Sequence, residues 1–103
     1  MTAALSSKNG KLYVGDREVL RGWESFSGWF WFALEKVGAQ DSELSDGFTV
    51  KGDTIWFGYV QGLEEEYGDF SQAELEQLAA RGQVWEIPAK DLPNAGRRAG
   101  VKQ

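Results

Sequence analysis

The chain contains no cysteine and no histidine, and these two absences narrow its chemistry more than any motif does. Without cysteine there is no disulfide framework, no thiolate zinc site, no iron–sulfur cluster and no cysteine nucleophile. Without histidine there is no Ser/His pair, and the commonest metal ligand is missing. Catalysis would have to use carboxylates, Lys, Arg or Tyr. We therefore expect a binding protein rather than an enzyme, with no cofactor and no metal ion.

Long apolar runs are also missing. No stretch approaches the roughly 20 apolar residues that span a bilayer, and residues 1–9 have no apolar core of signal-peptide length. A chain without cysteine is typical of a reducing compartment. From these features we expect a cytoplasmic protein.

The length and composition fit one compact domain. The chain has 103 residues, of which 42% are hydrophobic and 14% aromatic. A domain of this size buries roughly two-thirds of the surface that its unfolded chain exposes. We predict a single α+β domain over residues 11–92, with a flexible N-terminus at 1–10 and a flexible basic tail at 93–103.

Charge is distributed unevenly. The net charge is −5, but residues 1–96 carry 8 basic and 16 acidic side chains, because Arg97, Arg98 and Lys102 lie in the tail. An acidic domain repels phosphate backbones and anionic lipid headgroups over about a Debye length, roughly 8 Å at physiological salt. We therefore expect neither nucleic acid nor membrane as a direct partner, whereas a basic protein fits the charge.

Two hairpins are predicted from turn residues that separate short apolar runs. The first turn is Gly15-Asp16, a Gly-first connection that suits a type II′ turn. The second is the three-residue turn Lys51-Gly52-Asp53. These turns join residues 11–14 to 17–20, and residues 48–50 to 54–60.

Between the hairpins, residues 23–37 resemble one extended strand rich in aromatic side chains. Alternation places these on opposite faces, Trp29 and Trp31 against Phe30 and Phe32. Gly28 can bend this strand, and the polar residues 38–47 predict a loop.

One helix is predicted over about residues 72–82. Ser71-Gln72-Ala73-Glu74 has the pattern of a capping box, and Gly82 stands where a left-handed C-terminal cap is expected. The apolar stripe consists of Leu75, Leu78 and Ala79. Residues 84–87 then predict a last strand, and residues 89–103 an irregular segment.

These elements predict a curved antiparallel sheet of about five to six strands with one helix packed on it. A helix of about 11 residues is about 16 Å long and 10 Å wide, so it covers about half of one face of such a sheet. Each large aromatic side chain left in water forgoes on the order of 1.5 to 3 kcal/mol. Either the sheet curls or the hairpins pack over the second face, or the aromatic face is an interface with a second copy or with a partner.

An acidic stretch is the second feature. Residues 62–76 contain six acidic side chains and no basic one. Asp69 and Glu74 lie near a helix N-terminus, where negative charge is favoured, so a solvated loop explains part of the pattern. The functional alternative is a surface that presents phosphate-like charges to a basic protein, with aromatic side chains as anchors. The predicted partner-binding residues are Glu64, Glu65, Glu66, Tyr67, Asp69, Trp29 and Trp31.

Two further readings stay open. Two carboxylates from the acidic stretch, beside a tryptophan platform, are typical of enzymes that act on sugars. The acids Asp41, Glu43 and Asp46 could bind a divalent cation, although their spacing does not match an EF-hand loop.

About half of the chain carries a resemblance. Its residues are Trp29-Phe30-Trp31-Phe32-Ala33-Leu34-Glu35, Phe57-Gly58-Tyr59-Val60, Tyr67-Gly68-Asp69-Phe70-Ser71 and Glu74-Leu75-Glu76. In these segments the sequence resembles a family of small uncharacterised proteins carried by plasmids, integrative elements and phages. The family has no settled activity, so the resemblance implies only a context, in which small acidic proteins often occlude host factors.

The sequence therefore predicts a non-enzymatic protein-binding domain, an acidic accessory or host-interaction protein of a mobile genetic element that mimics nucleic acid. The alternative is a homo-oligomeric structural protein whose aromatic face is its own dimer interface.

Overall fold

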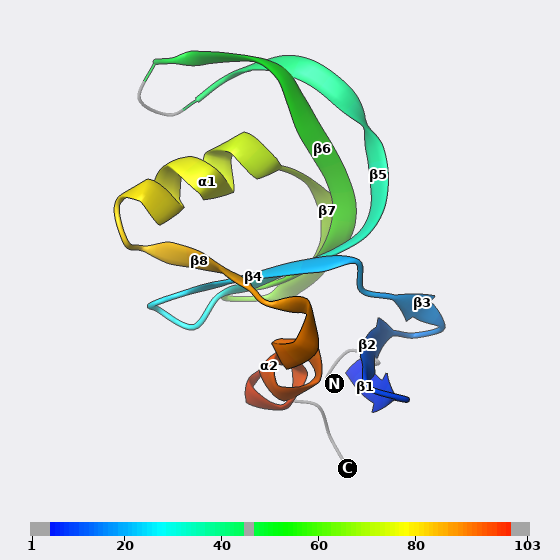
Figure 1. Cartoon of the computed structure of the whole chain (residues 1–103). Coiled ribbons are helices and arrows are strands. Elements are labelled where there is room, and N and C mark those ends of the chain that lie inside the picture. The colour runs from blue at the N-terminus through cyan, green and yellow to red at the C-terminus, as the bar shows by residue number, and fades with distance from the viewer. Residues whose placement is uncertain (1–4, 45–46, 100–103) are drawn as a thin grey trace.

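The computed structural model describes residues 5–44 and 47–99. It contains a five-stranded antiparallel sheet in the order β7-β6-β5-β4-β8 and a three-stranded sheet in the order β1-β2-β3 (Figure 1). The predicted α+β class is confirmed. In chain order the elements are β1 (Leu5–Lys8), β2 (Lys11–Val14), β3 (Arg17–Glu18), β4 (Arg21–Ser25), β5 (Phe30–Glu43), β6 (Thr49–Gln61), β7 (Glu65–Ser71), α1 (Gln72–Ala80), β8 (Val84–Ile87), the 3₁₀ turn η1 (Ala89–Asp91) and α2 (Leu92–Arg98).

The five-stranded sheet curls around α1. Trp23 in β4 and Phe70 in β7 have two strands between them in the sheet, yet their rings meet edge to face at 5.9 Å. The concave side, here called the inner face, therefore encloses a core of its own, which α1 completes (Figure 1). The buried residues of that core are Trp23, Ala33, Trp56, Leu75 and Val84.

The outer face of the same sheet is covered by α2 and by β1–β3 (Figure 1). Phe32 of β5 and Leu12 of β2 are both 0% exposed there. The remaining buried residues of this core are Leu5, Val14, Val19, Phe30, Leu34, Tyr59, Ile87, Leu92, Ala95 and Ala99. Curling of the sheet and packing of a hairpin over its second face, which the sequence offered as one explanation of the aromatic excess, both occur.

The predicted caps of α1, the first hairpin turn and the last strand are confirmed. Ser71 caps α1 by accepting a hydrogen bond from the Glu74 N–H at 3.1 Å, and Gly82 has the left-handed φ of 74° expected after the helix. The hairpin of β2 and β3 turns at Gly15, whose φ is 63°. Strand β8 matches the predicted residues 84–87.

A second helix and a first strand were missed. Residues 92–98 form α2, although the sequence predicted an irregular segment there; Pro93 at the start of the helix has its φ already fixed, and buried Leu92 and Ala95 anchor it. Residues 5–8 form β1, which turns into β2 at Asn9 and Gly10, both with positive φ. The parts of the predicted flexible ends at residues 1–4 and 100–103 lie outside the described residues.

The predicted single strand over residues 23–37 is wrong. It is divided into β4 and β5 by a reversal at residues 26–29, because Gly28 adopts a φ of 90° and its N–H donates to the Ser25 carbonyl at 3.0 Å. β4 and β5 are therefore antiparallel neighbours, with Trp23 opposite Trp31.

The predicted loop over residues 38–47 is wrong at residues 38–43, while residues 45–46 lie outside the described residues, and the predicted turn at residues 51–53 is wrong as well. β5 continues to Glu43, and β6 runs without interruption through residues 51–53. Gly52, with a φ of 68°, lies at one of three register shifts between β5 and β6, and its N–H donates to the Asp41 carboxylate at 3.1 Å. A left-handed glycine here produces a bulge instead of a chain reversal.

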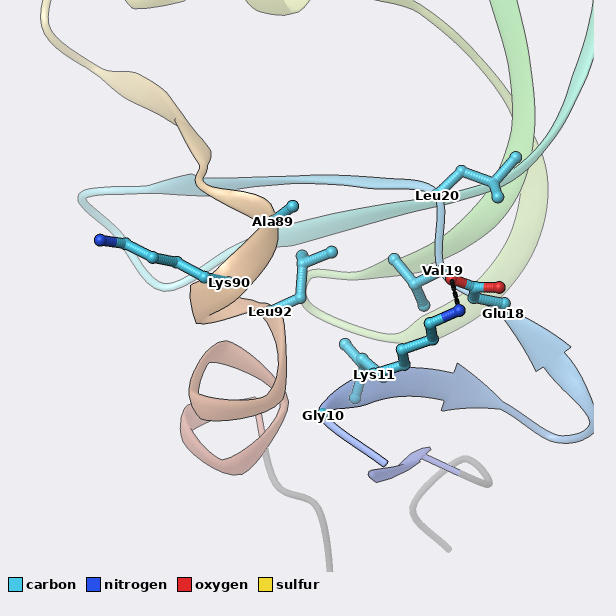
Figure 2. Close-up of a pocket in the computed structure, with 9 residues that line it drawn as sticks. Gly10, Lys11, Glu18, Val19, Leu20, Ala89, Lys90 and Leu92 are labelled. Carbon is cyan, nitrogen blue, oxygen red and sulfur yellow. Dashed lines mark ion pairs between the residues drawn. The ribbon is translucent and has the colours of Figure 1, made fainter. Parts of the chain in front are cut away.

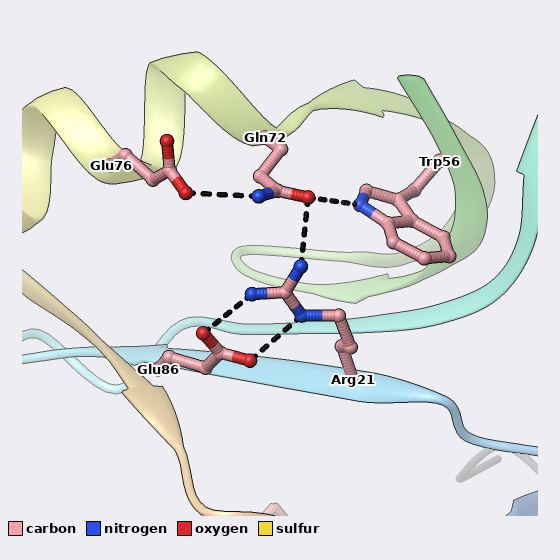
Figure 3. Close-up of polar contacts among 5 residues, drawn as sticks. All are labelled: Arg21, Trp56, Gln72, Glu76 and Glu86. Carbon is pink, nitrogen blue, oxygen red and sulfur yellow. Dashed lines mark hydrogen bonds and ion pairs between the residues drawn. The ribbon is translucent and has the colours of Figure 1, made fainter. Parts of the chain in front are cut away.

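A polar network of hydrogen bonds connects α1 to strands β4, β6 and β8 of the curled sheet (Figure 3). The Arg21 guanidinium donates twice to the Glu86 carboxylate, at 2.8 and 2.7 Å, and once to the Gln72 side-chain oxygen at 3.0 Å. That oxygen also accepts from the Trp56 indole at 2.9 Å, while the Gln72 amide donates to Glu76 at 2.9 Å. Because hydrogen bonding to Glu86 raises the pKa of Arg21 further, the cation stays charged.

Candidate functional site

The acidic segment is divided between the two faces of the sheet. A solvated loop was one of two interpretations of the acidic stretch, but residues 65–71 form β7, and consecutive strand residues point to opposite faces. Partners in register share a face. Two rows cross the sheet, Trp31, Val60 and Glu66 on the inner face, and Phe32, Tyr59 and Tyr67 on the outer face. Residues that are adjacent in the sequence are therefore separated in space.

Three of the predicted binding residues lie on the outer face. The Tyr67 ring lies 5.6 Å from that of Tyr59 and 6.2 Å from that of Phe57. Burial, with a contribution from the neighbouring Glu65 carboxylate, raises the pKa of Tyr59, so this phenol stays neutral within the outer core. Asp69 is the register partner of Phe57 on the same face. Glu65, Tyr67 and Asp69 therefore do not contribute to one site with Trp29 and Trp31.

The other four predicted residues come together on the inner face. They line two adjoining depressions that share Trp29, one of about 250 Å³ and one of about 190 Å³, here called the Trp29 hollow. The first depression is lined by Trp29, Val60, Leu63, Glu64 and Glu66, and the second by Ser25, Phe26, Ser27, Trp29, Trp31, Leu78, Gln83 and Val84. The hollow therefore extends from β7 to β8, the two edge strands of the five-stranded sheet.

Trp29 is held in place by the two turns beside it. The Ser25 hydroxyl accepts a hydrogen bond from the Trp29 N–H at 3.0 Å and bonds to the Ser27 hydroxyl at 2.9 Å. The indole lies against Gly62, where a Cβ atom would meet ring carbons at 2.4 Å. A glycine at position 62 is thus a condition for this placement of the ring.

Trp31 extends the aromatic surface from Trp29 toward the inner core. Its ring centroid lies 6.0 Å from that of Trp29, and it packs partly against the inner core. Leu78 on α1 belongs both to that core and to the lining of the hollow. The hollow is therefore a part of the inner face that α1 is too short to cover.

Two apolar side chains that sequence reasoning missed stand at the ends of the hollow. Leu63 is 93% exposed and Phe26 is 73% exposed. Both lie in turns, where an apolar residue between polar neighbours is the only signal available in the sequence. Side chains of this size gain little for the folded chain while they remain in water. They extend the apolar surface of the two tryptophans to both sides.

The lining of the hollow has charge of one sign. Glu64 and Glu66 are its only ionisable side chains among the residues that the structure describes, and neither a lysine nor an arginine contributes to it. An apolar floor with two carboxylates on one side fits a ligand that combines an apolar group with a cation. An indole face also attracts cations, by about 0.5 to 2 kcal/mol.

Another cavity lies on the other side of the sheet and is a weaker candidate. It has a volume of about 290 Å³ and separates the β2–β3 hairpin from η1 and α2 (Figure 2). Its floor is formed by the buried Leu12, Val19 and Leu92. The ammonium of Lys11 pairs with the Glu18 carboxylate at 3.5 Å, whereas the side chain of Lys90 points away from that pair. Two of its three charged side chains, Lys11 and Glu18, are thus paired with one another.

Metal-ligand clusters and membrane-spanning helices are both absent from the described residues. Across residues 5–44 and 47–99 there is no group of three or more side chains suited to hold a metal ion. Of the predicted set Asp41, Glu43 and Asp46, the last lies outside the described residues. In the same ranges, neither helix has the length and apolar character needed to cross a bilayer.

Comparison with known proteins provides no relative. No family model matches the chain, and no curated protein and no solved structure matches it either. The function therefore has to be argued from the geometry of the chain itself.

Proposed function

We propose that the chain is a non-enzymatic binding domain that takes a basic segment of a partner protein in the Trp29 hollow. The observation that carries the proposal is the combination of two partly buried tryptophans with Glu64 and Glu66 in two adjoining depressions whose lining contains no basic residue. Trp is enriched among the residues that dominate binding energy. Carboxylates at the rim of such a surface select a cationic partner and speed its approach.

The acidic charge of the whole chain supports the same partner. The net charge is −5, so a basic segment is attracted from a distance as well as at the site. A role as an accessory protein of a mobile genetic element that occludes a basic host protein is consistent with this chemistry. The cytoplasmic location and the mimicry of nucleic acid stay predictions.

Selection from a random peptide library displayed on phage tests the proposal. The enriched peptides are expected to contain Lys or Arg next to an apolar residue, and to bind the Trp29→Ala variant at least about tenfold more weakly, because an anchor of this kind contributes 2 kcal/mol or more. Binding should also weaken for Glu66→Gln but not for Glu43→Gln, a matched change on the distant part of β5.

Two outcomes contradict the proposal. Peptides that bind wild type and Trp29→Ala equally well would show that the hollow is not the site. Light scattering that finds a stable dimer, together with tryptophans that a neutral quencher cannot reach, would favour the homo-oligomeric alternative. In that case the Trp29 hollow is buried between two copies of the chain.

A further inference from the structure

The outer edge of β7 is regular and unpaired. β7 pairs only with β6, and no described strand lies on its other side. All seven residues of β7 have a partner in β6, from Glu65 opposite Gln61 to Ser71 opposite Ile55, with no register shift. The pairing of β5 with β6 is interrupted by three such shifts. The free edge of β7 therefore presents an ordered row of backbone donors and acceptors.

The only protection that the edge of β7 carries is its acidic side chains, Glu65, Glu66 and Asp69. Proteins commonly protect such edges with Lys, Pro or a bulge, and the sequence of β7, Glu-Glu-Tyr-Gly-Asp-Phe-Ser, contains none of these. Its charged residues are all acidic. Two copies of β7 paired with one another would place carboxylates against carboxylates, which is unfavourable. A second copy of this chain is therefore a poor occupant of the edge, whereas a basic strand is a good one.

The edge also adjoins the hollow. Glu66 lies on the inner face of β7 and lines the Trp29 hollow, while Glu65 and Asp69 point to the outer face. A strand added beside β7 would alternate in the same way. Side chains of one parity would point toward the hollow and Glu66, and those of the other parity would lie opposite Glu65 and Asp69, so a basic side chain meets a carboxylate on either face.

We propose that the basic segment binds as an additional strand of the sheet, hydrogen-bonded to the free edge of β7. This inference rests on the proposed function and adds the backbone geometry of the bound partner. Affinity in this mode comes from main-chain hydrogen bonds, and specificity comes from alternate side chains. The partner is then a segment that is extended, alternates basic with apolar residues, and lacks proline.

The test uses the full chain, labelled with ¹⁵N, and a seven-residue peptide of alternating Lys and Val. NMR follows the indole N–H of Trp29 and the backbone amides of β7 in one experiment. On binding, the Trp29 signal should shift, and every second amide of β7, those not bonded to β6, should exchange with solvent at least about tenfold more slowly. Peptides N-methylated at alternate residues provide the matched controls. Methylation of one parity should weaken binding more than about tenfold, and methylation of the other parity should change it little.

The outcomes separate this inference from the proposed function. A Trp29 shift with unchanged β7 amides and no effect of methylation parity would overturn strand addition and leave binding in the hollow intact. The same holds if the alternating peptide fails while peptides selected on phage bind. If neither kind of peptide binds, the proposed function fails as well. Protection of alternate β7 amides that grows with protein concentration alone would identify a second copy as the occupant, and would also overturn the inference.

Discussion

The outer and inner faces of the curled sheet carry similar aromatic side chains, but these side chains are buried to different extents. On the outer face, α2 and the β1–β3 sheet reduce the exposure of Phe32 to 0%. On the inner face, the nine residues of α1 cover Trp23 but stop short of Trp29. The difference shows that residue type does not decide which aromatics are core. The reach of the covering segments decides it, and what they leave uncovered stays partly exposed to solvent.

The largest expected effect is a difference in stability between a substitution in the outer core and one in the Trp29 hollow. Phe32→Ala should lower the free energy of unfolding by about 3 to 5 kcal/mol, because a large buried side chain leaves a cavity. Trp29→Ala should cost about 1 kcal/mol, since its ring is only partly covered. Urea denaturation of both variants measures the difference. Equal losses would show that Trp29 belongs to the core and would remove the contrast.

A smaller change disturbs the hollow and spares the fold. In Gly62→Ala the new methyl group overlaps the Trp29 ring, so the indole must move away from the turn. We expect basic peptides to bind about tenfold more weakly, the equivalent of about 1.4 kcal/mol. Gly38→Ala is the matched control, because nothing lies within 4 Å of its new Cβ atom. Calorimetric titration checks both variants, and a Gly62→Ala protein with full affinity would contradict the assigned position of Trp29.

The helix that covers part of the inner face, α1, can be destabilised at its N-terminus. The Ser71 hydroxyl accepts from the Glu74 N–H and donates to the buried Asp53 carboxylate, which also accepts from the Ala73 N–H at 2.9 Å. Ser71→Ala should therefore lower stability by about 1 to 2 kcal/mol. Thermal unfolding measures it. A loss close to zero would show that the Asp53 carboxylate caps the helix unaided.

The smallest effect on stability is expected from the acidic residues themselves. Simultaneous replacement of Glu64, Glu65 and Glu66 by Gln should change the free energy of unfolding by less than about 0.5 kcal/mol, because these side chains are exposed. Affinity for a basic peptide should fall, and its dependence on salt should weaken. Binding measured at two salt concentrations checks this. Unaltered affinity and salt dependence would exclude the carboxylates from recognition.

Local chemistry made part of this fold predictable from sequence. Ser71 and Gly82 define α1 through contacts with their own neighbours along the chain, so the sequence alone locates the helix. The signals at Asn9-Gly10 and Pro93 were equally local and were overlooked. By contrast, Gly28 and Gly52 both adopt positive φ, but one reverses the chain and the other forms a bulge. That choice depends on which strands pair.

The site was predictable only in its composition. Trp29, Trp31, Glu64 and Glu66 were named from the sequence, yet Glu65, Tyr67 and Asp69 were grouped with them because they follow one another along the chain. Their separation depends on the register of β7, which is fixed by pairing with β6. The hollow itself exists because curvature and two turns bring residues 26–29 beside residues 62–64. No local sequence pattern specifies that these two segments lie side by side.

Fluorescence quenching by caesium and by iodide tests the central claim most directly, in a Trp85→Phe background that removes another exposed indole. If Trp29 lies in an open hollow with negative charge, the ratio of quenching by the caesium cation to quenching by the iodide anion should be higher than the same ratio for free N-acetyltryptophanamide at equal ionic strength. A further Trp29→Phe substitution should abolish that difference, and a bound basic peptide should suppress it. A caesium-to-iodide ratio equal to that of the free indole, or a raised ratio that survives Trp29→Phe, would contradict an open acidic surface at Trp29.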